Sequence, residues 1–243
     1  MRAMRHLIKA ELVALVLSLS LTAPVAAGPL EDGQAAYYRH DCAAARQLWR
    51  PLADQGNASA QHKLGTTYEF GGDFGCGPHD YFEAAKWYRK AADQGNVDAE
   101  DELATFFYTG RGAGKDYVEA IKWFRKAADQ GFANAQLFLG LMNYNGEGVP
   151  QDYIEAVNWY RKAADQGDEQ AQFELGAMYD KGQGVPQDYV QAYKWLNLAA
   201  ARSPPLLEIR REIVVKLRDQ VAAKMTPAQI AEGQKLAREW RPK

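Results

Sequence analysis

The sequence predicts an all-α solenoid of stacked helix–turn–helix repeats, and three observations lead to this prediction. A sixteen-residue segment recurs almost unchanged, as DYFEAAKWYRKAADQG from Asp80, DYVEAIKWFRKAADQG from Asp116 and DYIEAVNWYRKAADQG from Asp152. The first Asp recurs at positions 41, 80, 116, 152 and 188, with spacings of 39, 36, 36 and 36 residues. Each unit has the pattern of two helices, and units of this kind bury their apolar faces by stacking on their neighbours.

Residues 1–27 are predicted to be a secretory signal peptide. A positively charged start precedes an apolar run from Leu12 to Leu21, and the small residues Val25 and Ala27 stand three and one positions before the expected cleavage site. The apolar run is shorter than the roughly 20 residues that span a bilayer. We therefore expect cleavage after Ala27 and a periplasmic or secreted mature protein. Retention as an uncleaved anchor stays open, and membrane contact is expected only through this segment.

The repeat units are expected near residues 41–79, 80–115, 116–151 and 152–187, followed by a half-unit at 188–203. In each unit the Asp is the expected N-cap of the first helix. An acidic or amide residue three positions later is expected to complete a capping box: Glu83, Glu119, Glu155 or Gln191. Gly95, Gly131 and Gly167 are suited to end these helices in the left-handed conformation. A second helix then runs to a Gly-x-Gly turn.

The first helix of each unit has a wide apolar face. At about 100° per residue, its apolar positions cover about 160° of the circumference, whereas an ordinary surface helix needs about 100°. Such a width indicates burial against neighbours on both sides. One tryptophan per unit is expected to fill the gap between successive units: Trp87, Trp123, Trp159 and Trp195. The alternative, that the aromatic residues bind a sugar or a quaternary amine, is less consistent with their core positions.

The repeated motif, AQxxLGxxYxxGxGVPxDYxxAxxWYRKAADQG, resembles the Sel-one-like repeat (SLR), a relative of the tetratricopeptide repeat. One register is carried by Leu175, Gly176, Tyr179, Gly182, Gly184, Asp188, Ala192 and Trp195. The resemblance covers about residues 34 to 202 and departs from the motif at Ala104, where Gly is expected. It implies a right-handed α/α solenoid, here residues 28–203, that binds another protein or peptide.

The C-terminal residues 204–243 are expected to cap the end of the solenoid. Five apolar residues share one helical stripe: Leu206, Ile209, Ile213, Leu217 and Val221. Thr226, Pro227 and Gln229 then open a last helix that should run to about Trp240. The alternative is that this segment is a docking arm.

Catalytic and cofactor motifs are absent from the sequence. It has no GxSxG, HExxH, CxxC or glycine-rich phosphate loop, so we expect no enzymatic activity, no cofactor and no metal. A zinc site formed by His40 and His79 with a cysteine is the alternative to loop histidines at repeat junctions. The net charge of −2 gives no indication of nucleic-acid binding.

The two cysteines, Cys42 and Cys76, are predicted to form a disulfide. An oxidising compartment permits such a bond. Cys42 begins the first helix of one unit, and Cys76 lies in the enlarged turn that leads to the equivalent point of the next unit.

A candidate protein-binding ridge lies on the exposed arc of the first helices, which in tetratricopeptide-like stacks line the concave side. It consists of Lys86, Arg89, Lys90, Lys122, Arg125, Lys126, Arg161 and Lys162. Alternatively, acidic residues of the same helices, such as Asp93 and Asp129, neutralise these cations. The resemblance implies an exported adaptor or regulator that binds a protein or peptide in the bacterial envelope. An enzyme or ligand-binder acting on peptidoglycan or β-lactam-like compounds stays the alternative, and the sequence does not predict the oligomeric state.

Overall fold

The computed structural model describes residues 28–71, 77–112, 114–202 and 208–243, which form helices and turns but no strand. The expected signal peptide and Cys76 lie outside these residues. The described part contains twelve helices: α2 (Pro29–Tyr38), α3 (Cys42–Asp54), α4 (Ala58–Glu69), α5 (Tyr81–Ala92), α6 (Val97–Thr109), α7 (Tyr117–Asp129), α8 (Ala133–Asn145), α9 (Tyr153–Gln166), α10 (Glu169–Lys181), α11 (Tyr189–Arg202), α12 (Glu208–Ala222) and α13 (Pro227–Glu239). None of these helices is long and apolar enough to span a membrane.

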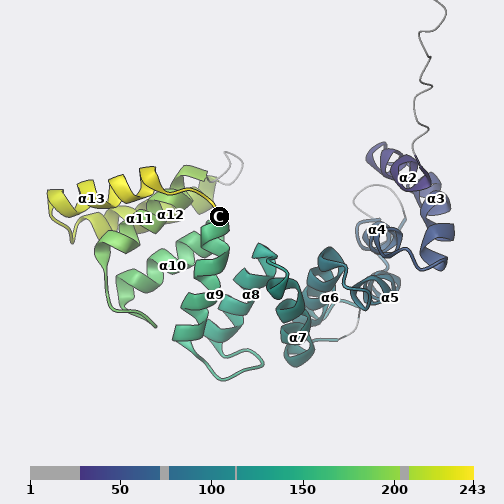
Figure 1. The fold of residues 1–243 in the computed structure, drawn as a ribbon, viewed down its shortest axis with the longest axis horizontal. Helices are drawn as coiled ribbons and strands as arrows, with labels where there is room; N and C mark the ends of the chain where they lie inside the picture. Colours follow the sequence, from purple (N-terminus) through teal and green to yellow (C-terminus); the bar gives the residue numbers. More distant parts are fainter. Residues whose placement is uncertain (1–27, 72–76, 113, 203–207) are drawn as a thin grey trace, which may run out of the picture.

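The helices stack into a right-handed solenoid that curves into an arc, confirming the predicted fold class (Figure 1). Helices α2 and α3 lie at one end of the arc, and α11, α12 and α13 lie at the other. The closest packing joins α4 with α5, α6 with α7, α8 with α9, and α10 with α11. A unit therefore consists of an even-numbered helix followed by an odd-numbered one.

The expected position of the ridge helices on the concave side is wrong for α5 and α7. Figure 1 shows these two helices on the outer side of the arc, with α4, α6 and α8 nearer its inside. The contacts agree with this arrangement. Asn134 of α8 reaches Asp101 of α6 with a short side-chain hydrogen bond of 2.7 Å. The contact between α5 and α7 instead uses a long side chain: the Arg89 guanidinium reaches to 5.2 Å from the ring centroid of Trp123.

The Asp residues cap the helices as predicted, but the capping boxes do not form. The Asp80 and Asp116 side chains accept hydrogen bonds from the backbone N–H of Glu83 and Glu119. The backbone N–H of Asp80 donates instead to the Tyr68 carbonyl oxygen at 2.9 Å, and the equivalent bond recurs at Asp116, Asp152 and Asp188. Because a carbonyl of the preceding helix already accepts this hydrogen, the Glu side chain turns outward.

Glycines allow close contacts at two repeated positions, although α6 has Ala104 at the second of them. The second glycine of the Gly-x-Gly turn has a positive φ and lies against the start of the preceding odd-numbered helix; a Cβ on Gly184 would lie 2.1 Å from the Tyr153 carbonyl oxygen. Within α8, a Cβ on Gly140 would lie 2.5 Å from the Tyr160 ring. The predicted left-handed glycines after the first helices are also present, with φ values of 81°, 90° and 97° at Gly95, Gly131 and Gly167. These contacts set the spacing within and between units.

The hydrophobic core continues along the whole stack. One cluster includes buried residues from α5 to α8, and a second includes residues of α9, α10, α11 and α13. Trp87, Trp123 and Trp195 are at most 3% exposed. Trp159 is partly buried and packs against the first cluster. The packing interpretation of the repeated aromatic residues is therefore consistent with the fold.

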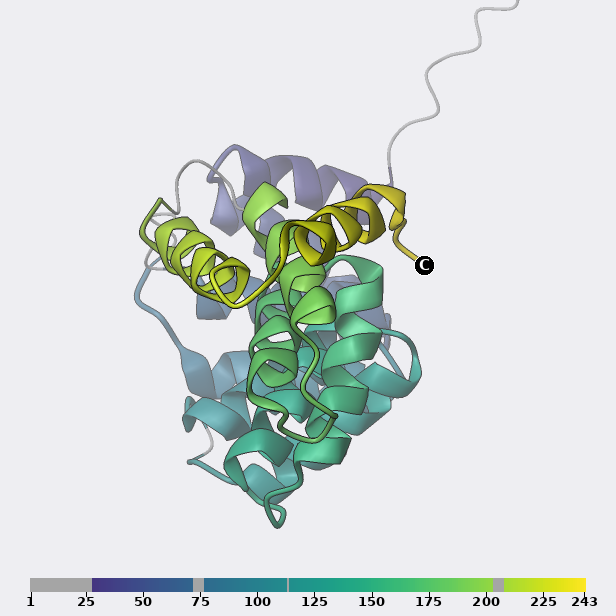
Figure 2. The same ribbon diagram turned by 90° about the vertical axis from the view of Figure 1, so that its left-hand side faces the viewer.

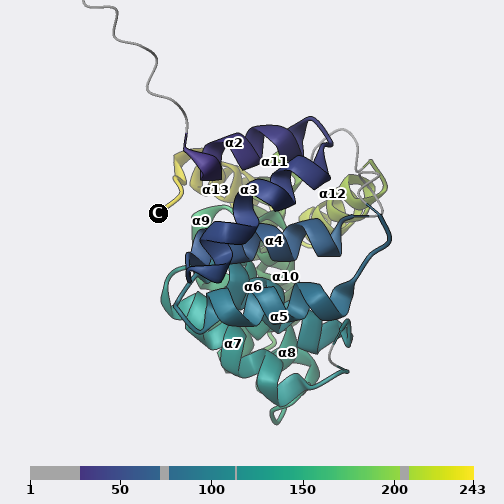
Figure 3. The same ribbon diagram turned by 90° about the vertical axis from the view of Figure 1, so that its right-hand side faces the viewer.

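Helices close both ends of the solenoid. Figure 3 shows α2 at the N-terminal end, above α3 and α4, and the Trp49 indole donates to the Leu30 carbonyl oxygen at 3.0 Å. Figure 2 shows α12 and α13, in yellow-green and yellow, across the other end. Lys224, in the turn between them, forms an ion pair of 2.8 Å with Asp180 of α10.

The C-terminal prediction is correct in outline but wrong in one detail. Thr226 and Gln229 form the capping box that begins α13, and this helix ends at Glu239, one residue before Trp240. In α12, Val214 and Val221 face the core, whereas Ile213 is 55% exposed. Leu217 and Val221 of the predicted stripe do pack on the core, and Val214 takes the place expected for Ile213. Leu206 lies outside the described residues.

Candidate binding surfaces

The eight ridge residues lie on α5, α7 and α9 with a repeated geometry. In each helix a lysine lies over the ring of that helix's own tryptophan: the nitrogen-to-centroid distance is 4.0 Å for Lys90 and 3.9 Å for Lys126 and Lys162. This recurrence follows from the three-residue spacing of Trp and Lys on one helix face. The ridge is thus a regular row of cations, placed on the outer side of the arc for α5 and α7.

Carboxylates pair with part of the ridge. Lys86 contacts Glu83 at 2.6 Å, and Lys122 contacts Glu119 at 3.2 Å. Among the described residues, no ion pair involves the other six ridge cations: Arg89, Lys90, Arg125, Lys126, Arg161 and Lys162. Asp165 of α9 pairs with Lys243 at 2.5 Å and not with a ridge cation. The described part of the ridge therefore keeps a positive excess.

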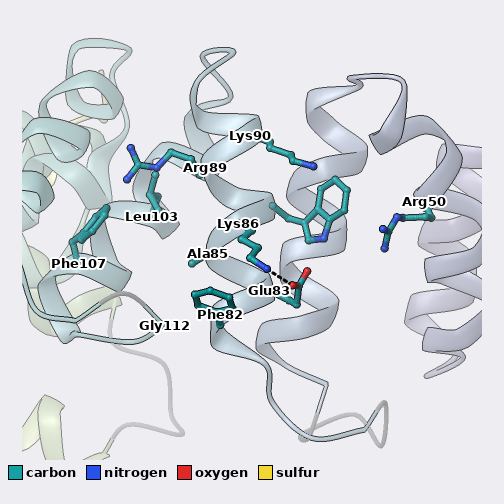
Figure 4. Close-up of a pocket in the computed structure, with 11 residues that line it drawn as sticks. Arg50, Phe82, Glu83, Ala85, Lys86, Arg89, Lys90, Leu103, Phe107 and Gly112 are labelled. Atoms are coloured by element: carbon teal, nitrogen blue, oxygen red, sulfur yellow. Dashed lines mark hydrogen bonds and ion pairs between the residues drawn. The ribbon is translucent and has the colours of Figure 1, made fainter.

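Two clefts open along this row. The first, called the α5 cleft, has a volume of about 570 Å³ and is lined by Arg50, Phe82, Glu83, Ala85, Lys86, Trp87, Arg89, Lys90, Leu103, Phe107 and Gly112 (Figure 4). The second, called the α9 cleft, has a volume of about 450 Å³ and is lined by Glu155, Asn158, Trp159, Arg161, Lys162 and Asp165. The two clefts contain equivalent Trp–Lys pairs but differ in their charge.

A third depression, the α8–α10 groove, lies between even-numbered helices. It has a volume of about 390 Å³ and is lined by Asn134, Leu137, Phe138, Leu141, Tyr160, Gln170 and Glu174. Leu137 and Leu141 are partly exposed along α8, and Phe138 stacks on Phe124 with ring centroids 4.9 Å apart. The groove therefore combines an apolar floor with amide and carboxylate groups at its edge.

Sequence reasoning missed a group of buried carboxylates around α6. Burial raises the pKa of Asp101 to about 6, although one of its oxygens accepts the hydrogen bond from Asn134. Burial, with the nearby charges of Glu69 and Asp101, raises the pKa of Glu102 to about 8. Glu69 is itself buried and accepts a hydrogen bond of 2.7 Å from the Tyr88 hydroxyl. The sequence did contain a signal for this group: the segment AEDEL at residues 99–103 has three acidic residues, whereas the equivalent segments of α4, α8 and α10 have one or none.

These carboxylates do not form a metal centre. Within the described residues, no group of three or more His, Cys, Asp or Glu side chains is arranged to hold a metal ion. His79 contacts the Glu69 carbonyl oxygen through Nδ1 at 2.5 Å and stacks on Tyr81. Cys42 is buried at the start of α3, but Cys76 lies outside the described residues, so the disulfide stays a prediction.

Comparison with known proteins identifies the repeat. The Sel1 repeat model matches residues 28–57, 58–96, 97–132, 133–168 and 169–204. These boundaries place the even-numbered helix first in every unit, in agreement with the closest helix pairs. Comparison with curated proteins gives no match.

Two solved structures are similar over most of the chain. A Sel1 repeat protein from Oxalobacter formigenes is 29% identical, with a TM-score of 0.70, over 88% of this chain and 83% of that one. A protective antigen present in uropathogenic Escherichia coli strains, with an SLR fold, is also 29% identical, with a TM-score of 0.55. That similarity covers 87% of this chain and 52% of the antigen, so this chain matches about half of the antigen's length.

Proposed function

Because the chain belongs to the Sel1 repeat family, a family of protein-binding scaffolds, we propose that it is an exported adaptor that holds a protein or peptide in the bacterial envelope. The observation that carries this proposal is the α8–α10 groove. Its apolar floor includes Leu137 and Leu141, which the chain leaves partly exposed. Solenoids commonly bind partners through such continuous surfaces. An apolar groove with polar groups at its edge suits an amphipathic segment of a partner.

The experiment captures partners from envelope extract with the tagged mature protein and two matched variants. Leu141→Glu places a charge in the groove, and Ile154→Glu makes the same kind of change at an outer position that is 62% exposed. We expect a stoichiometric partner with the parent protein and with Ile154→Glu, and a strong loss with Leu141→Glu. Circular dichroism checks that both variants are folded. Equal capture by both folded variants would place the partner elsewhere.

Export is part of the proposal and has its own measurements. The charged start and apolar run of residues 1–27 support cleavage after Ala27. Mass spectrometry of exported protein should give an N-terminus at or near Gly28, and an intact Met1–Ala27 segment would contradict cleavage.

A Cys42–Cys76 disulfide is proposed to accompany export. It would close a loop of about 35 residues and stabilise the fold by a few kcal/mol, mostly by restricting the unfolded chain. The exported protein should resist alkylation until it is reduced. Rapid labelling of both thiols in native protein would contradict the bond.

The enzymatic alternative rests on the raised pKa values of Asp101 and Glu102, because catalytic acids often have such values. It requires turnover of muropeptides or of a chromogenic β-lactam by the purified protein. Turnover that Glu102→Gln abolishes would favour this alternative. Without turnover, the two carboxylates are structural.

A further inference from the structure

The structure assigns a second binding site to the α5 cleft, and we propose that this cleft holds an acidic segment of a protein partner. Its volume of about 570 Å³ lies within the range of about 300–1,000 Å³ that ligand sites occupy. It lies between α3, α5 and α6, apart from the α8–α10 groove (Figure 4). The inference goes beyond the function proposed for the groove and does not depend on it.

The charge of the cleft is the first argument. Glu83 is the one carboxylate among the described lining residues, against four cations: Arg50, Lys86, Arg89 and Lys90. Glu83 pairs with Lys86 at 2.6 Å. Arg50 pairs with Asp54 of its own helix at 3.1 Å. Arg89 and Lys90 are in no ion pair with a described residue. Two positive charges therefore stand at the cleft without a carboxylate partner.

Aromatic rings hold these two cations in place. Lys90 Nζ lies 4.0 Å from the ring centroid of Trp87. The guanidinium of Arg89 lies 5.4 Å from the ring centroid of Phe107 and 5.2 Å from that of Trp123. A long side chain that is already ordered loses less conformational freedom when a ligand binds. The rings leave the positive charge in place, so a carboxylate meets preorganised cations.

The position of the Trp87 ring is the second argument. Trp87 lines the cleft and is 3% exposed. Lys90 Nζ lies 4.0 Å from its ring centroid, and the Arg50 guanidinium lies 5.0 Å from it. A cation over an aromatic ring keeps its charge, so the ring holds two lining cations in position without neutralising them.

The apolar lining identifies the kind of anion. Phe82 is 62% exposed beside the cleft, and Phe107 and Leu103 form part of its wall. A small inorganic anion would leave these surfaces uncovered. A peptide that alternates acidic and apolar side chains would satisfy the cations and bury the rings together. The chemistry therefore favours an acidic, partly apolar peptide segment.

The α9 cleft provides a matched comparison within the same chain. Lys162 lies over Trp159 at 3.9 Å, as Lys90 lies over Trp87. There, however, the lining contains two cations, Arg161 and Lys162, and two carboxylates, Glu155 and Asp165, of which Asp165 is paired with Lys243. The same Trp–Lys geometry thus occurs once with four lining cations against one carboxylate and once with equal numbers of lining cations and carboxylates.

The test measures peptide binding to the full mature protein by fluorescence anisotropy. The probe is a labelled ten-residue peptide that alternates glutamate and leucine, and a lysine–leucine peptide is the charge-reversed control. Lys90→Glu should weaken binding of the acidic peptide about tenfold or more, which corresponds to about 1.4 kcal/mol. Lys162→Glu is the matched control and should change the affinity less than about twofold. Glu83→Gln should strengthen binding, because it removes the carboxylate from the cleft.

Salt and alternative ligands complete the test. The affinity of the parent protein should fall as salt rises from about 0.05 to 0.3 M, because exposed charges are screened. Equal weakening by Lys90→Glu and Lys162→Glu, or no binding of the acidic peptide, would overturn the proposal. So would binding to phosphatidylglycerol vesicles with the same dependence on Lys90 and no peptide binding. Because no cellular partner is used, failure here is distinct from failure of the groove experiment.

Discussion

Glu100 of α6 stands where α4, α8 and α10 have glutamine, and this difference yields a quantitative prediction. Gln61, Gln136 and Gln172 each donate from Nε2 to the carbonyl oxygen eight residues earlier, at 2.9, 3.2 and 3.2 Å. A carboxylate has no hydrogen to donate, so Glu100 lacks the equivalent bond to Ala92. Glu100 is 3% exposed, and burial raises the pKa of its carboxyl group.

Glu100→Gln is expected to stabilise the protein. The introduced amide keeps an oxygen for the Gln130 side chain, which now donates to Glu100 at 2.7 Å, just as Gln94 donates to Gln61. It also supplies the missing donor, and a typical net hydrogen bond contributes about 0.5–1.5 kcal/mol. With the buried charge removed as well, the free energy of unfolding near neutral pH should rise by about 1–2 kcal/mol. The corresponding rise in Tm is about 2–8 °C.

The gain should depend on pH. Because folding raises the pKa of Glu100, the folded state binds a proton more readily than the unfolded state does. The parent protein therefore gains stability as pH falls from the raised pKa toward the ordinary value of 4.5, and the advantage of the amide shrinks over that window. Urea unfolding followed by circular dichroism measures both effects.

The matched control for this substitution is Gln136→Glu, which places a carboxylate in the equivalent buried position of α8. It should lower the free energy of unfolding by a similar amount, because it removes the bond to the Ala128 carbonyl oxygen. If Glu100→Gln is neutral or destabilising near neutral pH while Gln136→Glu is also neutral, the reasoning about this position is refuted.

Three further predictions concern the same packed layer. Tyr88→Phe removes the donor to Glu69 and should lower the free energy of unfolding by about 1–3 kcal/mol in urea titrations. Burial, with neighbouring carboxylates, raises the pKa of Glu102 to about 8, so thermal stability should rise as pH falls from about 8 toward 4.5. Glu102→Gln should flatten that slope, and an unchanged slope would contradict the assignment. Gly140→Ala would bring a Cβ to 2.5 Å from the Tyr160 ring and should cost about 1–3 kcal/mol, which a Tm measurement detects.

Local signals in the sequence predicted the helices well. The Asp caps and the glycines that follow the first helices depend on residues within one turn, and both occur where expected. The prediction that the Glu83 side chain accepts a hydrogen bond from the backbone of its N-cap residue was wrong. The Tyr68 carbonyl oxygen, from the preceding helix, accepts the bond from the Asp80 N–H instead. A pattern within one helix contains no information about that competitor.

The side of the arc on which the ridge lies could not be predicted from the repeat alone. A period of 36 residues has no intrinsic starting point, so the helix that begins at Asp80 was taken as the first of its unit. Packing decides otherwise, because α4 and α5 form the closer pair. The charges of the α6 carboxylates were visible in the sequence, but the burial that raises their pKa values depends on neighbouring helices.

The junctions between units have a consequence for how such a protein can change in evolution. The second glycine of each turn, Gly112, Gly148 or Gly184, lies against the start of the preceding odd-numbered helix in the same way. A duplication of one whole period would join new units through a contact that the chain already contains, and a deletion of one period would restore the same contact. Gain or loss of part of a period would place a side chain where the backbone of the neighbouring unit lies. The chain can therefore lengthen or shorten its binding surface in whole repeats without requiring any new interface.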